Sequence, residues 1–251
     1  RLCPVGHHCG GETAKDCWRE VSRRLLRDIV PFVLDLAPFR YQVALSRKGA
    51  SVMLLAPDGP RRTLLGHFGE VLGMEFFPLG ERAVSWSRDG AVVVWDTATG
   101  HAVQFIRHWG PVECARVFPH GDRLITCGES GACTIWDVAN GLPTSTLGAR
   151  RGWPNPSVEV FPEGDRVLTW GRTTWATVWD ASHGKVVCML RRHASVAHFA
   201  KIFPRGDRVV SGGFENHRAA IWDSASCEVL HELAHANWLV DVAVLRAGRA
   251  V

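Results

Sequence analysis

The dipeptide Trp-Asp recurs at regular intervals along this chain. It occurs at Trp95-Asp96, Trp136-Asp137, Trp179-Asp180 and Trp222-Asp223, in steps of 41, 43 and 43 residues. Chance does not space so rare a pair so evenly. A fixed period of this length is typical of repeat architectures, in which each unit is one small structural module.

A second landmark runs in phase with the first. The pattern Phe-Pro-x-Gly, followed by an acidic residue and Arg, begins at Phe77, Phe118, Phe161 and Phe203. An upstream copy appears when Ser46–Gly49 is laid on Ser87–Gly90, with Leu54-Leu55 in place of Trp-Asp, and a partial copy begins at His235. The predicted units are therefore residues 30–66, 67–107, 108–150, 151–192, 193–234 and, incomplete, 235–251, after an N-terminal segment of residues 1–29.

Alternating apolar residues and turn signals predict the structure of one unit. The expected strands are Val71–Phe77, Arg82–Ser87, Ala91–Asp96 and His101–Ile106, and Arg88-Asp89-Gly90 is typical of a tight hairpin turn. Four short strands per unit exclude the helical repeats of similar period. One sheet of this size cannot bury both of its faces alone, so successive sheets must stack face to face.

Composition limits the classes of protein that this chain can belong to. Hydrophobic residues make up 46% of the 251 residues, which is ordinary for a packed domain and argues against disorder. A net charge of +4 is too small to indicate nucleic-acid binding by itself. No apolar run approaches the ~18 residues of a membrane span.

The cysteines carry a prediction about compartment. The chain has eight, without a dense framework, and several have apolar neighbours. We expect Cys114, Cys127, Cys133, Cys188 and Cys227 to be reduced core thiols of a cytoplasmic or nuclear protein.

The Trp-Asp endings, the pair Gly66-His67 and the unit length resemble the WD-repeat β-propeller family, over residues 30 to 251. The resemblance implies an all-β fold, a β-propeller of four-stranded antiparallel blades, with five recognisable repeats, the start of a sixth and an incomplete ring. It also implies a buried hydrogen-bond relay, carried in the second unit by His67, Ser85, Asp89 and Trp95. Lys48, Ser130 and Thr173 replace the turn aspartate in other units, so the relay is expected to be damaged there.

The same resemblance points to one face of the propeller as a docking platform, where loops from every blade gather. The residues expected on this face are Phe68, Arg88, Trp109, Trp153, Arg172, Trp175, Phe214 and Trp238. Tryptophan and arginine most often anchor protein interfaces, although several of these tryptophans could simply pack between blades.

Three other motifs have structural alternatives. His231-Glu232-Leu233-Ala234-His235 matches the HExxH zinc-protease motif, which needs a helix, but its place in the repeat puts it on a strand. The N-terminal cysteines and histidines Cys3, His7, His8, Cys9 and Cys17 lack the paired spacing of zinc modules. Residues 14–29 have the pattern of a short amphipathic helix, suited to packing on the first blade or to a surface partner.

These patterns favour a non-enzymatic scaffold that binds other proteins or peptides within a multiprotein complex, without cofactor, metal or nucleic acid. The alternative is a C-terminal regulatory or sensor domain of a larger signalling enzyme, and a remote one is the zinc protease. Too few repeats for the usual ring also predict that the sequence is a fragment, which would associate more readily than a longer chain.

Overall fold

The computed structural model describes residues 42–45, 51–55, 62–148, 157–171, 173–191, 196–213 and 218–234, together with residues 239, 242 and 244. Within these ranges all regular secondary structure is β-strand, so the described fold is all-β. The predicted N-terminal helix lies outside the described residues.

The strands form five antiparallel sheets, each ordered as its strands occur in the sequence. The first sheet contains β1 (Gln42–Leu45), β2 (Ser51–Leu55) and β3 (Arg62–Leu65). The second contains β4 (Val71–Phe76), β5 (Arg82–Ser87), β6 (Ala91–Asp96) and β7 (Ala102–Arg107). The third contains β8 (Val112–Val117), β9 (Arg123–Gly128), β10 (Cys133–Asp137) and β11 (Pro143–Leu147). The fourth contains β12 (Ser157–Val160), β13 (Arg166–Trp170), β14 (Ala176–Asp180) and β15 (Val186–Leu190). The fifth contains β16 (Ala197–Ile202), β17 (Arg208–Gly213), β18 (Arg218–Asp223) and β19 (Val229–Ala234).

The strands predicted for the second unit are confirmed. The two central strands match to the residue, and the two outer ones differ by one residue at their ends. Phe77 leaves the ladder because its N–H bonds the Arg82 carbonyl and so begins the turn. The last strand starts at Ala102, because the Asp96 N–H closes the hairpin on the His101 carbonyl.

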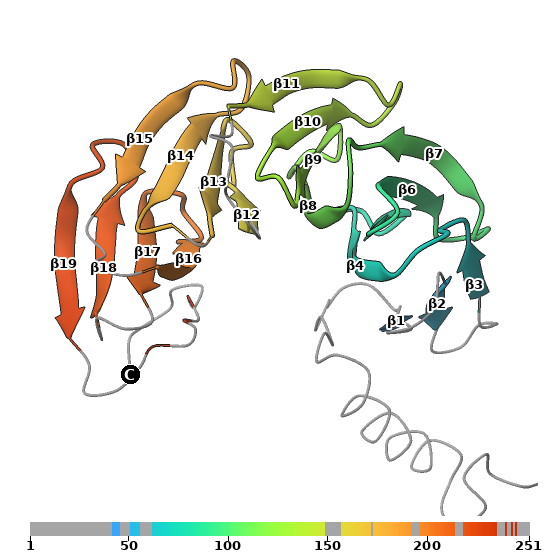
Figure 1. Ribbon diagram of the computed structural model, residues 1–251, viewed down its shortest axis with the longest axis horizontal. Helices are drawn as coiled ribbons and strands as arrows, with labels where there is room; N and C mark the ends of the chain where they lie inside the picture. The colour runs from blue at the N-terminus through green and yellow to red at the C-terminus, as the bar shows by residue number, and fades with distance from the viewer. Residues whose placement is uncertain are drawn as a thin grey trace, which may run out of the picture.

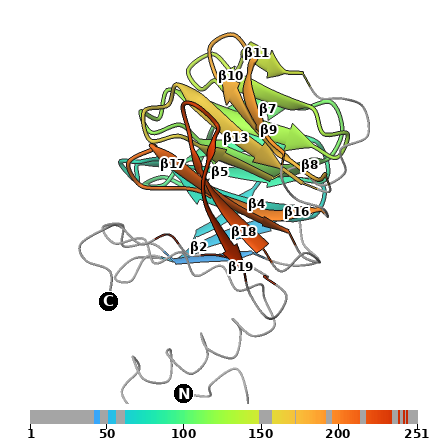
Figure 2. The ribbon, with the colours of Figure 1, turned by 90° about the vertical axis from the view of Figure 1, so that its left-hand side faces the viewer.

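The sheets follow one another along an arc (Figure 1). Strands β4, β8, β12 and β16 lie on its inner side, and β7, β11, β15 and β19 lie on its outer side. Contacts between β4 and β8, and between β8 and β12, join neighbouring sheets at the inner side. In the perpendicular view the sheets overlap one another (Figure 2).

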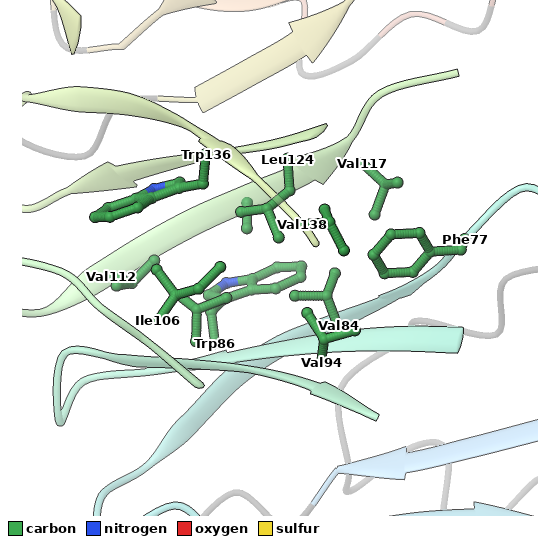
Figure 3. Packing of buried hydrophobic residues seen from close by; sticks show 12 residues of the cluster. Phe77, Val84, Trp86, Val94, Ile106, Val112, Val117, Leu124, Trp136 and Val138 are labelled. Atoms are coloured by element: carbon green, nitrogen blue, oxygen red, sulfur yellow. The ribbon is translucent and has the colours of Figure 1, made fainter. Parts of the chain in front are cut away.

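A separate hydrophobic core fills each space between neighbouring sheets. The core between the second and third sheets includes Phe77, Trp86 and Val94 from one side and Leu124 and Trp136 from the other (Figure 3). The central strand β6 is buried on both faces, whereas the outer strand β7 is largely exposed. This explains why the run of three valines at 92–94 is continuous, since both of its faces meet a neighbouring sheet.

Each repeated tryptophan contributes to the core shared with the preceding sheet. Trp95 packs with Val52 and Leu64 of the first sheet, and Trp136 packs with residues of the second. Trp179 and Trp222 take the same place in the next two cores. On the far side of the fifth sheet, Phe199 and Val210 pack with Leu239, Val242 and Val244 from the predicted partial unit.

The Phe-Pro-x-Gly pattern forms the same turn in four sheets. In the second sheet the Gly80 N–H bonds the Phe77 carbonyl at 2.8 Å, and Gly80 has a φ of 73°, which disfavours other residues. Successive turns also touch. Arg123 stacks on the Phe118 ring and donates to the Gly164 carbonyl of the next sheet at 2.9 Å, and Arg166 likewise reaches the Ser224 carbonyl. These arginines connect neighbouring sheets at the end of the strands where the turns lie.

Candidate functional site: the loop face around Phe68 and Trp109

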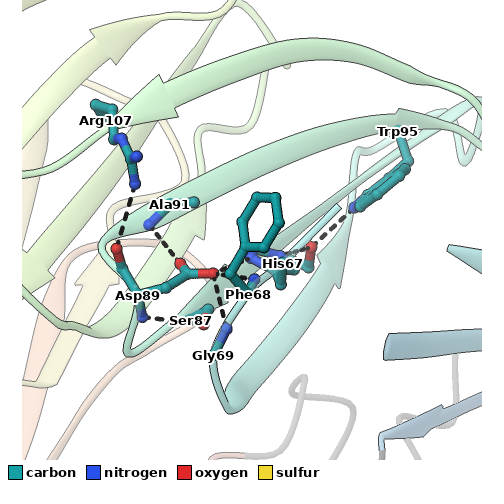
Figure 4. Close-up of polar contacts among 9 residues, drawn as sticks. His67, Phe68, Gly69, Ser87, Asp89, Ala91, Trp95 and Arg107 are labelled. Atoms are coloured by element: carbon teal, nitrogen blue, oxygen red, sulfur yellow. Dashed lines mark hydrogen bonds and ion pairs between the residues drawn. The ribbon is translucent and has the colours of Figure 1, made fainter. Parts of the chain in front are cut away.

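A buried series of polar contacts lies beneath the loop that carries Phe68. The Trp95 indole N–H donates to Ser85 Oγ at 2.8 Å, and Ser85 Oγ lies 2.7 Å from His67 Nε2 (Figure 4). Because the serine hydroxyl accepts from tryptophan and can donate to Nε2, the arrangement favours the His67 tautomer with its proton on Nδ1. Burial lowers the pKa of His67, although Asp89 acts in the opposite direction.

Asp89 links this series of contacts to the loop that carries Phe68, mainly by accepting backbone N–H groups. Its Oδ2 accepts the N–H of Phe68 at 2.6 Å and that of Gly69 at 3.1 Å, and Oδ1 accepts the N–H of Ala91 at 2.7 Å. The distance from Oδ2 to His67 Nδ1 is 3.6 Å, longer than a hydrogen bond. Burial alone would raise the pKa of Asp89, but the three N–H donors and His67 together lower it.

The four residues predicted for the relay thus lie together in the structure, with Asp89 holding the loop rather than bonding the imidazole. The third, fourth and fifth sheets share the contact between the tryptophan and a Ser or Thr hydroxyl. Trp136 donates to Thr126 at 2.8 Å, Trp179 to Thr169 at 2.7 Å and Trp222 to Ser211 at 2.8 Å.

Residues in the place of Asp89 make different contacts in the neighbouring sheets. Ser130 accepts the N–H of Ala132 within its own turn, and Thr173 donates to the Trp175 carbonyl. Neither contact reaches a preceding loop, as the carboxylate of Asp89 does. In the third and fourth sheets the tryptophan is therefore anchored, but the turn residue does not bond the preceding loop as Asp89 does.

The repeated aspartates have a local role at the opposite end of the strands. Oδ1 of Asp137, Asp180 and Asp223 accepts two backbone N–H groups of the following turn, and Oδ1 of Asp96 accepts the N–H and hydroxyl of Thr99. These contacts hold the hairpin turn before each outer strand. They require no binding partner to explain them.

Residues expected on the docking face fall into three groups. Phe68 and Trp109 are 93% and 96% exposed, at the ends of neighbouring sheets where Arg88 is also exposed. Trp175 is half-buried, and the Arg191 guanidinium lies 5.8 Å from its ring centre. Its side chain is therefore partly packed against the protein and only partly available to a partner. The remaining four, Trp153, Arg172, Phe214 and Trp238, lie outside the described residues.

Of the expected alternatives to a docking site, the structure describes part of one, the HExxH motif. Residues His231–Ala234 of the HExxH motif lie in β19, paired with β18, so this part of the motif is strand and lacks the helical spacing of a zinc site. Among the described residues no cluster of three potential ligands could hold a metal ion. The N-terminal cysteines and histidines lie outside the described residues.

The expectation of reduced thiols is wrong for four cysteines. Cys127 and Cys133 form a disulfide, as do Cys188 and Cys227, whereas Cys114 belongs to neither disulfide. Cys127 and Cys133 are direct partners across β9 and β10, and Cys188–Cys227 connects the fourth sheet to the fifth. Their spacing in the sequence gives no sign of these pairs, because strand pairing and stacking bring them together.

Sequence reasoning also missed a set of charged residues on the inner strands. Glu75, Arg116, Glu159 and Lys201 each lie two residues before the Phe of the Phe-Pro pattern, so the register could have revealed them. Glu75 Oε2 accepts the Val117 N–H at 3.1 Å, and Glu159 Oε2 accepts the Ile202 N–H at 3.2 Å, each from the next inner strand. Burial raises the pKa of Glu75 to about 7, against the opposing effects of Arg116 and Val117.

The structure defines a repeat protein of stacked antiparallel sheets, and each of the four four-stranded sheets is anchored by a buried tryptophan bonded to a Ser or Thr. The family model described as WD domain, G-beta repeat matches residues 58–96 and 100–137, so the chain carries WD repeats. Each match begins near the outer strand of one sheet and ends with the third strand of the next. One sequence repeat therefore contributes strands to two neighbouring sheets. No curated protein matches the chain significantly. Within the described part of the chain, no helix has the length and hydropathy of a membrane span.

WD repeats indicate a role of the interaction-scaffold kind, since domains built from them are generally non-catalytic interaction modules. The geometry of the loop face supports a more specific proposal.

Proposed function

We propose that the chain is a non-enzymatic scaffold that binds another protein through the loop face carrying Phe68, Arg88 and Trp109. The observation that carries this proposal is the almost complete exposure of two aromatic side chains on neighbouring loops. Exposed aromatic residues cost solubility unless a partner covers them, and aromatic anchors dominate the energy of many interfaces.

The Phe68 loop is suited to binding because it is already ordered. The Asp89 carboxylate accepts the N–H groups of Phe68 and Gly69. The turn that carries Asp89 is itself held by hydrogen bonds to Ser87 Oγ and to the Glu70 carbonyl. A side chain presented from a fixed loop loses less conformational entropy on binding. The hydrogen bonds between Asp89 and the Phe68 loop therefore support a binding role as well as a structural one.

The test compares exposed apolar residues at the two ends of the same sheets. Phe68→Ala and Trp109→Ala remove the proposed anchors, whereas Leu79→Ala and Leu142→Ala are matched controls at the opposite end, 77% and 61% exposed in the parent protein. Proteins crosslinked to the purified wild type in extract are identified by mass spectrometry and their recovery is compared among variants. We expect recovery to fall at least about fivefold for the first pair only. Equal recovery from all four variants would show that this face is not the docking surface.

A further inference from the structure

Residues from two neighbouring loops contact the Asp89 turn. Phe68 and Gly69 bond the Asp89 carboxylate on one side of the turn. On the other side the His108 N–H donates to the Gly90 carbonyl at 2.9 Å, and the Arg107 guanidinium lies 3.4 Å from the Asp89 carbonyl oxygen. Figure 4 shows Phe68 and Arg107 on either side of this turn. We call Phe68, Arg88, Arg107 and Trp109 the aromatic–arginine patch.

The charge that this patch presents is positive. The Asp89 carboxylate is turned inward to three N–H groups and its side chain is only 12% exposed. The Arg88–Glu70 ion pair, 3.2 Å between Nε and Oε2, is well exposed to water and therefore weak, so Arg88 can exchange partners. Arg107 is exposed and contacts a backbone carbonyl. Both guanidinium groups are thus placed to donate hydrogen bonds to carboxylates of a partner.

The same end of the fourth and fifth sheets also carries arginines. Arg191 follows β15 and Arg218 begins β18. Both are exposed, and Arg218 forms an exposed ion pair with Glu232, 3.4 Å between Nη1 and Oε2. Antiparallel topology puts these positions at the end of the strands where the Phe68 and Trp109 loops lie. The opposite end instead carries the four aspartates of the Trp-Asp pairs, and there Arg123 and Arg166 lie beside Asp122 and Asp165. The two loop faces of the molecule therefore differ in charge.

We infer that the aromatic–arginine patch binds an extended, acidic protein segment that also carries apolar side chains. This inference rests on the proposed function and names the chemistry of its partner. Carboxylates pair with the guanidinium forks, and aliphatic or aromatic side chains cover Phe68 and Trp109.

Nucleic acid fits the patch less well. Glu70 and Glu129 are exposed on the same loop face and would repel a continuous phosphate backbone, whereas a peptide can place its carboxylates between them. The net charge of +4 is also modest for a phosphate-binding surface.

The test uses fluorescence anisotropy with labelled peptides of about ten residues. The probe alternates Glu with Leu, and comparison peptides alternate Lys with Leu or Glu with Ser. A single-stranded oligouridylate of similar length tests nucleic acid. We expect the Glu-Leu peptide to bind at least about tenfold more tightly than either comparison peptide or the oligonucleotide, and its binding to weaken as salt rises.

Variants locate the binding. The double variant Arg88→Gln/Arg107→Gln and the single variant Trp109→Ala should each weaken Glu-Leu binding at least about fivefold. Arg205→Gln removes an exposed arginine from the opposite loop face and should leave binding unchanged. Thermal melts of each variant show whether the fold is retained.

The outcomes separate this inference from the function on which it rests. Equal binding of the Glu-Leu and Lys-Leu peptides, tighter binding of the oligonucleotide, an equal effect of Arg205→Gln or no binding of the Glu-Leu peptide would each overturn it. If crosslinked partners still depend on Phe68 and Trp109, the scaffold proposal stands without the acidic partner. If they do not, both fail.

Discussion

Oδ2 of Asp89 accepts the backbone N–H of Phe68 at 2.6 Å, across 21 residues of sequence. This contact joins the hairpin turn of the second sheet to the loop that enters it. It places the most exposed phenylalanine of the described chain directly on a buried support formed by His67, Ser85 and Trp95. Stability and presentation of the binding face therefore depend on the same carboxylate.

Replacing Asp89 should destabilise the protein more than replacing its counterpart in the next sheet. Asp89→Ala leaves the N–H groups of Phe68, Gly69 and Ala91 without their acceptor, and we expect a loss of about 1–3 kcal/mol in the free energy of unfolding. Ser130→Ala removes one long contact, 3.5 Å to Ala132, and should cost under about 0.5 kcal/mol. Urea titration measures both, and equal shifts in the two variants would contradict the assignment.

Glu75 should make stability depend on pH in a specific direction. Its pKa is raised from 4.5 to about 7, so the folded protein holds a proton that the unfolded chain releases. The contribution of Glu75 is therefore greatest below about pH 4.5 and declines as pH rises to about 7, by roughly 3 kcal/mol.

Buried histidines act in the opposite sense over part of this range. Burial lowers the pKa of His67 and His108 below 6.5, so they stabilise the fold above that pH and the contribution is lost on acidification. The difference between wild type and Glu75→Gln isolates the carboxyl group, since glutamine can still accept the Val117 N–H. We expect the stability of Glu75→Gln relative to wild type to rise between pH 4.5 and 7. Parallel pH profiles for the two proteins would contradict this.

The disulfide between Cys188 and Cys227 should stabilise the contact between the fourth and fifth sheets. It closes a loop with a sequence separation of 39, for which chain entropy predicts about 2–4 kcal/mol. Cys188→Ser should lower stability by about that amount and remove most of the effect of a thiol reductant on the melting temperature. Peptide mapping without reduction checks the pairing directly. Alkylation of all eight cysteines in unreduced, denatured protein would rule out both disulfides.

A methyl group at Gly73 should not fit beneath the Trp86 ring. An added Cβ there would overlap the ring carbons of Trp86, whereas one at Gly148 meets no atom within 4 Å. We expect Gly73→Ala to cost about 1–3 kcal/mol and Gly148→Ala to be nearly neutral in thermal melts. A neutral Gly73→Ala would mean that Trp86 can move without loss of packing.

Some of the candidate site follows from repeat register alone. The spacing of Trp-Asp and of the turn residues placed Phe68 and Trp109 at matching positions one unit apart, and the structure exposes both. Arg107 did not stand out, because nothing in its neighbourhood marks the approach of its guanidinium to the Asp89 turn, 18 residues away. That approach depends on how β7 pairs with β6.

The period, the strands and their turns can be predicted from the sequence, because they depend on local conformational preferences and on apolar residues repeated in register. Which groups meet across the stacked sheets depends on the three-dimensional packing. The choice of backbone donors by Asp89, the disulfide between Cys188 and Cys227 and the contact of Glu75 with Val117 all join residues from different hairpins or sheets. Such contacts are fixed by the spacing and rotation between packed sheets, which many residues set together and no short motif encodes.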